Sequence, residues 1–220
     1  MQITQGLDGF LWTSMSANNC NTYLIQGEGA RVLVDPGHLR LFDHVERGLR
    51  EVGLEPADID LVIATHAHPD HVEAVRLFND LPTLFAMPEI DWRLLKDIGM
   101  ALGVSLDMEA YQPDFFLSEG DLEIKGLSLQ VVRSPGHSPG SVSLYWPETK
   151  ALLTGDVLFK EGLGRVDLPG GNGAVLKESI RRLSLLETEW LCPGHGDVVT
   201  GRTAVSANFS LVEKFWFTYI

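Results

Sequence analysis

Residues 65–71 read Thr-His-Ala-His-Pro-Asp-His, which places three histidines and an aspartate close together at His66, His68, Asp70 and His71. The segment follows an apolar run at 60–65 and precedes a stretch of helical character. Where a strand gives way to a helix the backbone turns sharply, so several side chains can converge on one point. Imidazole and carboxylate are ligands that zinc and similar divalent metals prefer. One such residue alone would be a solvated side chain or a helix cap, but the four together predict a metal site.

The pattern of an apolar strand followed by histidine recurs twice later in the chain. Ser-Pro-Gly-His ends at His137, and Cys-Pro-Gly-His ends at His195. Five of the seven histidines fall in such segments, whereas His38 and His44 do not and are interpreted as ordinary polar residues. A further apolar run, Leu-Leu-Thr-Gly-Asp, ends at Asp156 and places a carboxylate at the end of a predicted strand.

These seven residues predict a dinuclear metal site. We expect His66, His68 and His137 to bind one ion. Asp70, His71 and His195 are expected to bind the second, with Asp156 bridging both and positions left open for water. Asp70 and Asp156 are also the candidate catalytic residues.

Length and patterning favour one α/β domain over residues 1–220, of which 45% are hydrophobic. Strands are predicted at 20–26, 30–34, 60–65, 83–87, 115–117, 122–125, 127–133, 142–146, 151–154 and 190–192. Helices are predicted at 41–52, from 70 onward, at 89–102 with Trp92, Leu95 and Leu102 on one stripe, and at 174–186. Two packed sheets with helices outside, a four-layer αββα sandwich, satisfy that order.

Charge and composition exclude several classes of partner. The formal net charge of −13 argues against a nucleic-acid partner, since phosphate binding requires a basic surface. No apolar run is long enough for a membrane span, and the first residues do not resemble a secretory signal, so a cytoplasmic location is expected. The two cysteines, Cys20 and Cys192, are too few for a disulfide framework and are interpreted as buried thiols.

The ordered ligand set resembles that of the metallo-β-lactamase superfamily, and it spans most of the chain. Within that superfamily, the segments SPGHSPGSVSLY, TGDVLFKEGLGRVDLPGG and CPGHGD look like the small single-domain hydrolases similar to glyoxalase II. The resemblance implies the αββα fold and two divalent ions, zinc first, with iron or manganese as alternatives. It also implies hydrolysis of a thioester such as S-lactoylglutathione. True β-lactamases of this superfamily commonly carry cysteine where this chain has Asp156, so antibiotic hydrolysis fits poorly.

The resemblance further implies a small anionic thioester as substrate. Arg165 matches a basic residue that the family places near glutathione, so it is a candidate for binding a substrate carboxylate, the alternative being a plain surface arginine. Only 25 residues, Gly196 to Ile220, follow His195, so the helical extension of the larger glyoxalase II enzymes is not expected. Glycines between 162 and 173 suggest a tight or mobile loop over the site. The aromatic tail at 215–220 is expected to dock onto its own core, with a homodimer contact or a substrate wall left open.

The expected mechanism is attack on the thioester carbonyl by a metal-bridging hydroxide, which Asp70 also helps to orient. The leaving thiolate, with an ordinary pKa of about 8.5, needs no strong general acid. Asp35 ends the run Val-Leu-Val-Asp-Pro-Gly and is a candidate hydrogen-bond partner for a ligand histidine. The alternative for Asp35 is a turn residue before Pro36.

Two other functions remain open on the sequence. Persulfide dioxygenases of the same fold bind one iron through residues that match His66, His137 and Asp156. Hydrolysis is favoured because Cys-Pro-Gly-His-Gly is closer to the hydrolase branch. A non-catalytic ligand-binding protein is the third hypothesis, and its expected mark, a missing ligand residue, is not found.

Overall fold

The computed structural model describes residues 1–101 and 106–220, and these form two compact units. The first unit comprises Met1–Leu117 and Glu123–Leu127, and the second comprises Ser118–Leu122 and Ser128–Ile220. The expectation of a single domain over 1–220 stays a prediction.

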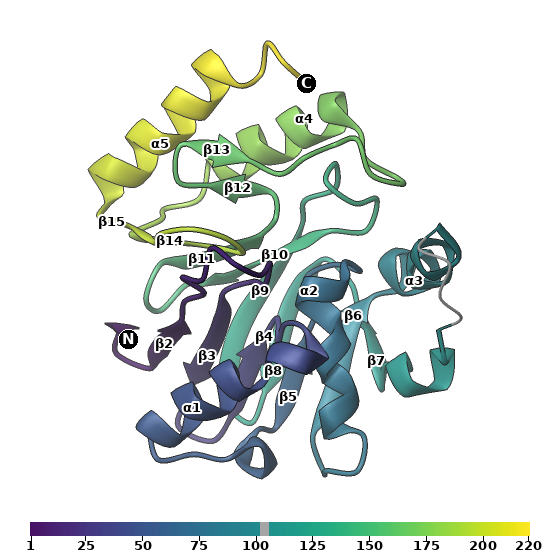
Figure 1. Cartoon of the computed structure of the whole chain (residues 1–220). Coiled ribbons are helices and arrows are strands. Elements are labelled where there is room, and N and C mark those ends of the chain that lie inside the picture. The colour runs from purple at the N-terminus through teal and green to yellow at the C-terminus, as the bar shows by residue number, and fades with distance from the viewer. Residues whose placement is uncertain (102–105) are drawn as a thin grey trace. The chain divides into compact units, whose positions relative to one another are not determined.

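The first unit is built on a seven-stranded sheet whose strands follow one another in chain order (Figure 1). Its strands are β1 (Gln2–Thr4), β2 (Leu7–Phe10), β3 (Thr22–Gln26), β4 (Arg31–Val34), β5 (Leu61–Ile63), β6 (Leu84–Pro88) and β7 (Phe115–Leu117). Pairs from β1 to β4 are antiparallel, whereas pairs from β4 to β7 are parallel. The carboxyl ends of β4 to β7 therefore lie at one edge of this sheet.

The helices of the first unit are η1 (Leu39–Leu41), α1 (Asp43–Glu51), η2 (Pro56–Asp58), α2 (Pro69–Val72), η3 (Glu73–Phe78), α3 (Glu89–Ala101) and η4 (Met108–Tyr111). All except η1 and η2 contribute buried side chains to an apolar cluster that they share with the sheet. Strand residues Leu24, Leu33 and Val62 share a buried apolar cluster with Leu49 of α1 and Val75 of η3. Because side chains alternate along a strand, every second strand residue faces these helices.

The second unit has a six-stranded sheet in the order β15-β14-β11-β10-β9-β8. Its strands are β8 (Gly120–Ile124), β9 (Leu127–Arg133), β10 (Val142–Trp146), β11 (Ala151–Gly155), β14 (Trp190–Pro193) and β15 (Val199–Thr200), and a separate two-stranded hairpin joins β12 (Leu158–Phe159) to β13 (Gly162–Leu163). β10 is antiparallel to β9 and β11, and β14 is parallel to β11. Hence β9, β11 and β14 run in the same direction.

Two helices, α4 (Gly173–Leu183) and α5 (Arg202–Phe215), pack together in the second unit (Figure 1). Ile180 of α4 and Phe209 of α5 share a buried cluster with Leu152 and Leu191 of the sheet. The side chain of Asn172 caps α4 by accepting from the Val175 N–H at 3.1 Å. Each unit is thus one sheet with helices against one face, the component that an αββα architecture requires.

The predicted elements agree with the structure in most places. The strands predicted at 115–117, 127–133 and 142–146 have the same bounds as β7, β9 and β10. The helix predicted from residue 70 begins at Pro69 and changes to 3-10 geometry at Glu73, since α2 and η3 follow each other directly. The predicted position Leu102 lies outside the described residues. Helix α5 was not predicted, although Val205, Phe209 and Val212 have helical spacing and are buried.

Among the helices of the described residues, none is both long enough and apolar enough to cross a membrane.

Candidate metal centre

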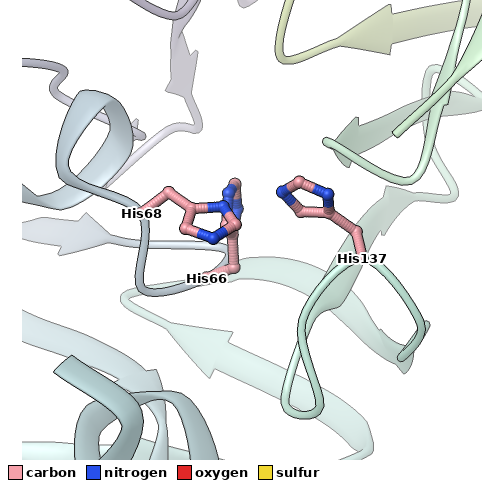
Figure 2. A group of neighbouring side chains, drawn as sticks. All are labelled: His66, His68 and His137. Carbon is pink, nitrogen blue, oxygen red and sulfur yellow. The ribbon is translucent and has the colours of Figure 1, made fainter. Parts of the chain in front are cut away.

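The first unit gathers four predicted ligands directly after β5. His66, His68, Asp70 and His71 are all buried. The ring centroids of His66 and His68 are 4.9 Å apart, and those of His66 and His71 are 4.1 Å apart. Figure 2 shows His66 and His68 projecting from the segment that follows β5.

The carboxylate of Asp35, which directly follows β4, fixes this cluster. It accepts hydrogen bonds from the Thr65 N–H at 2.7 Å and from Thr65 Oγ1 at 2.8 Å. It also lies 2.9 Å from His71 Nδ1, which must donate because a carboxylate only accepts. Asp35 has a backbone φ of 55°, an uncommon conformation for a residue with a side chain, and hydrogen bonds of both its carboxylate and its main chain hold it there.

The same hydrogen-bond chain orients His66. The Thr65 hydroxyl donates its hydrogen bond to Asp35. In its 3.0 Å contact with His66 Nδ1 the hydroxyl oxygen must therefore accept, and Nδ1 carries the hydrogen. In both His66 and His71 the Nε2 atom therefore carries the lone pair. Metal-binding histidines typically donate their other ring N–H to an oxygen in this way. Thr65 was not among the predicted site residues, and its role depends on a partner thirty positions earlier in the chain.

Asn18 is a second site residue that the sequence did not reveal. Its Nδ2 donates to Asp70 Oδ2 at 2.6 Å, which orients the carboxylate. Asn18 stands in the run Asn-Asn-Cys-Asn at 18–21 before β3, and nothing in that run distinguishes it from its neighbours.

The second unit gathers the other three predicted ligands. His137, Asp156 and His195 follow β9, β11 and β14, whose common direction brings their carboxyl ends to one edge. Nε2 of His137 lies 3.5 Å from Asp156 Oδ2, and Nε2 of His195 lies 3.4 Å from the same oxygen. Two ligands of one ion, at about 2.1 Å in tetrahedral geometry, are separated by about 3.4 Å. The three side chains are therefore close enough for Asp156 to act as a ligand together with either histidine.

His137 is oriented by the main chain. Its Nδ1 lies 2.7 Å from the carbonyl oxygen of Arg165, which can only accept, so Nδ1 is the donor and Nε2 carries the lone pair. Figure 2 shows His137 on the loop that follows β9. The Arg165 guanidinium makes two 2.7 Å hydrogen bonds to Asp167, which lower the pKa of that carboxyl to about 2. The expected role of Arg165 in substrate binding stays a prediction.

Gly164 allows this close approach of the chain. A Cβ atom at Gly164 would lie 1.7 Å from the main-chain oxygen of Asp156 and 3.0 Å from His137 Nδ1. No side chain can occupy that space, so glycine is required beside the ligands. Of the glycines predicted to form a loop, Gly162 lies in β13 and Gly173 begins α4.

The remaining histidines and the cysteines make other contacts. His38 Nδ1 is 2.8 Å from Glu73 Oε2, and His44 Nε2 is 2.9 Å from the carbonyl oxygen of Phe10. Cys20 and Cys192 are buried thiols; Cys20 Sγ donates to the carbonyl oxygen of Asp35 at 3.3 Å, and burial raises the pKa of the Cys192 thiol. Neither histidine belongs to the predicted ligand set, and a raised pKa disfavours the reactive thiolate form of Cys192.

The donor set fits a divalent metal. All seven predicted ligands belong to groups of histidine and aspartate side chains that could hold a metal ion. Five imidazoles and two carboxylates are nitrogen and oxygen donors of the kind that zinc, iron and manganese accept. The assignment of individual residues to individual ions stays a prediction.

Replacement of Asp35 by asparagine should weaken metal binding. An amide offers one acceptor oxygen where the carboxylate serves three donors, so His71 loses its fixed orientation. We expect metal affinity to fall by about 10- to 100-fold, measured by competition with a chromophoric chelator. Glu73→Gln is the matched control, because it alters a histidine–carboxylate pair outside the predicted ligands. An equal loss in both variants would contradict the role of Asp35.

Replacement of Gly164 by alanine should destabilise the second unit. The clash with the Asp156 main chain is expected to cost about 3 kcal/mol or more in the free energy of unfolding, measured by urea denaturation. Gly162→Ala is the control, since a Cβ there has no neighbour nearer than 3.9 Å. Equal stability of the two variants would refute the close approach at Gly164.

Comparison with known proteins gives a family. The model of the metallo-beta-lactamase superfamily matches residues 15–195. A probable metallo-hydrolase of Methanocaldococcus jannaschii is 36% identical over 188 residues, which cover 81% of this chain and 88% of the relative. The hydroxyacylglutathione hydrolase GloC of Haemophilus influenzae is 29% identical over 191 residues, covering 83% of this chain and 87% of the relative.

Solved structures agree with the family match. A metallo-beta-lactamase family protein of Thermus thermophilus, TTHA1429, superposes with a TM-score of 0.78 at 24% identity, covering 98% of this chain and 81% of its own. TTHA1623 in a di-iron-bound form gives a TM-score of 0.71 at 31% identity, covering 92% of this chain and 96% of its own. The predicted α/β metallo-β-lactamase fold is confirmed. The chain belongs to the metallo-β-lactamase superfamily.

Proposed function

We propose that this chain is a metal-dependent hydrolase that cleaves a small anionic thioester, similar to hydroxyacylglutathione hydrolases. The observation that carries the proposal is the orientation of three imidazoles. The Nδ1–H groups of His66, His71 and His137 each donate a hydrogen bond to an oxygen. Their Nε2 atoms are therefore left to bind metal.

The proposed metal content is two divalent ions. His66, His68 and His137 would hold one ion, Asp70, His71 and His195 would hold the other, and Asp156 would be a further ligand. Zinc is proposed first, with iron and manganese as alternatives, and the di-iron form of TTHA1623 supports an occupancy of two. Bound divalent ions lower the pKa of water toward about 7 and polarise a carbonyl group.

The residues of the chain supply orientation and substrate binding. Asp70, whose carboxylate is fixed by Asn18, is the proposed group that orients the attacking water. Asp156 is the second proposed catalytic residue, because its Oδ2 lies close to both His137 and His195. The leaving thiolate is a weak base, so no side chain has to act as a strong general acid.

The substrate class rests on similarity and charge. Hydroxyacylglutathione hydrolase GloC is similar over most of the chain, which supports a glutathione thioester. We propose that Arg165 binds a carboxylate of that substrate. To bind the substrate, the exposed Arg165 would break its ion pair with Asp167 and form one with the substrate carboxylate. Breaking the pair costs little, because an exposed ion pair contributes little stability.

Metal analysis followed by parallel assays tests the proposal. We expect about two divalent ions per chain and thiol release from S-lactoylglutathione. Asp156→Ala should lose metal and turnover, by at least about 10³-fold, because it removes a donor to both ions. Asp121→Ala, an exposed aspartate of the same unit, should behave like the wild type.

Other outcomes would replace the proposed activity. Oxygen uptake with glutathione persulfide, without thiol release from thioesters, would assign the chain as a dioxygenase. Hydrolysis of a lactone alone would change the substrate class. A metal-loaded chain that binds small molecules without turning them over would be a binding protein.

A further inference from the structure

The C-terminal helix α5 is hydrogen-bonded to the turn of the β12–β13 hairpin in the second unit. Asn208 of α5 donates from Nδ2 to the carbonyl oxygen of Phe159 at 2.9 Å and accepts at Oδ1 from the Glu161 N–H at 2.7 Å. Trp216, directly after α5, donates from Nε1 to the carbonyl oxygen of Glu161 at 2.7 Å. The main chain of the turn is therefore hydrogen-bonded to α5 on both sides of Lys160.

The turn requires this support because of its backbone conformation. Glu161 has a φ of 57°, in the left-handed region that residues with a side chain seldom adopt. Both its N–H and its carbonyl group are bound to side chains of the C-terminal segment. Asn208 is only 6% exposed, and its amide is suited to the task because it offers a donor and an acceptor at once.

The β12–β13 turn also contacts the segment that carries His195. The rings of Phe159 and His195 meet edge to face, with centroids 5.8 Å apart and an interplanar angle of 83°. Lys160 Nζ lies 2.8 Å from Asp197 Oδ2, two positions after His195. That ion pair is exposed and contributes little by itself, so the ring contact is the stronger of these two links between the turn and the His195 segment.

We propose that Asn208 is a positioning residue for His195: its hydrogen bonds fix the β12–β13 turn and thereby keep the Phe159 ring in contact with the imidazole. The consequence for metal binding rests on the proposed function, in which His195 is a ligand. Asn208 itself touches neither a proposed ligand nor the substrate. Its effect passes through the hairpin. Loss of a direct hydrogen-bond partner of a ligand typically weakens metal binding by about 10- to 100-fold, so we expect the lower end of that range for Asn208.

The test is Asn208→Ala in the full 220-residue chain, with two measurements. The first is the chemical shifts of the His195 ring nuclei by NMR, assigned with a His195→Gln variant, in the chain as purified and after addition of Zn²⁺. The second is Zn²⁺ affinity by chelator competition. We expect the His195 resonances to move, because the ring current of Phe159 changes, and the affinity for one of the two ions to fall about tenfold.

The loss of Zn²⁺ affinity should differ among related variants in a defined way. Phe159→Leu should reproduce the loss of affinity, and the double variant with Asn208→Ala should lose no more than the larger single effect, because both act through one contact. Asn208→Asp keeps the acceptor for the Glu161 N–H but loses the donor to Phe159, so its effect should be intermediate.

Phe209→Leu separates positioning from general destabilisation. Phe209 is the next residue of α5 and packs in the core of the second unit, so this variant should lower Tm. It should leave the His195 resonances and the Zn²⁺ affinity unchanged. Equal changes in Phe209→Leu and Asn208→Ala, or no change of the His195 resonances in Asn208→Ala, would overturn the proposal.

The two proposals fail separately. If the wild-type chain binds no divalent metal, the proposed function is wrong, while the His195 resonances of the chain as purified still decide whether Asn208 positions the imidazole.

Discussion

The hydrogen bonds of the Asp35 carboxylate are the interaction on which the ligand cluster of the first unit depends. One buried side chain links the end of β4 to Thr65 and His71, which follow β5. This linkage works because the two strands are parallel and end at the same edge. A buried carboxylate is costly unless its oxygens are hydrogen-bonded, and here the donors that satisfy it are the groups that orient the ligands. Stability and ligand geometry thus share the same contacts.

The second unit orients its ligands mainly through the backbone. His137 is held by a carbonyl oxygen of the segment after β13, and that segment comes close only because Gly164 has no side chain. The β12–β13 hairpin lies between Asp156 and this contact in the chain, and Asn208 of α5 and Trp216, directly after α5, bind its turn. The proposed positioning role of Asn208 would make the C-terminal segment part of the support of the site, although it contains no proposed ligand.

The two units orient their histidines by the same kind of hydrogen bond, but with different acceptors. In each, a histidine donates Nδ1–H to an oxygen and keeps the lone pair of Nε2. A carboxylate supplies that oxygen for His71, whereas a main-chain carbonyl supplies it for His137. Membership in the metallo-β-lactamase superfamily agrees with such a donor set.

The sequence by itself determined the fold family and the candidate ligands, because apolar strands ending in histidine or Gly-Asp are local patterns. It also gave Asp35 as a candidate partner of a ligand histidine, because the carboxylate ends a strand, but it left a turn residue before Pro36 as the alternative. Tertiary structure alone revealed the roles of Thr65, Asn18 and Asn208. Their partners lie thirty or more positions away, and a polar residue that orients a distant side chain has the same local sequence signature as one that only contacts water.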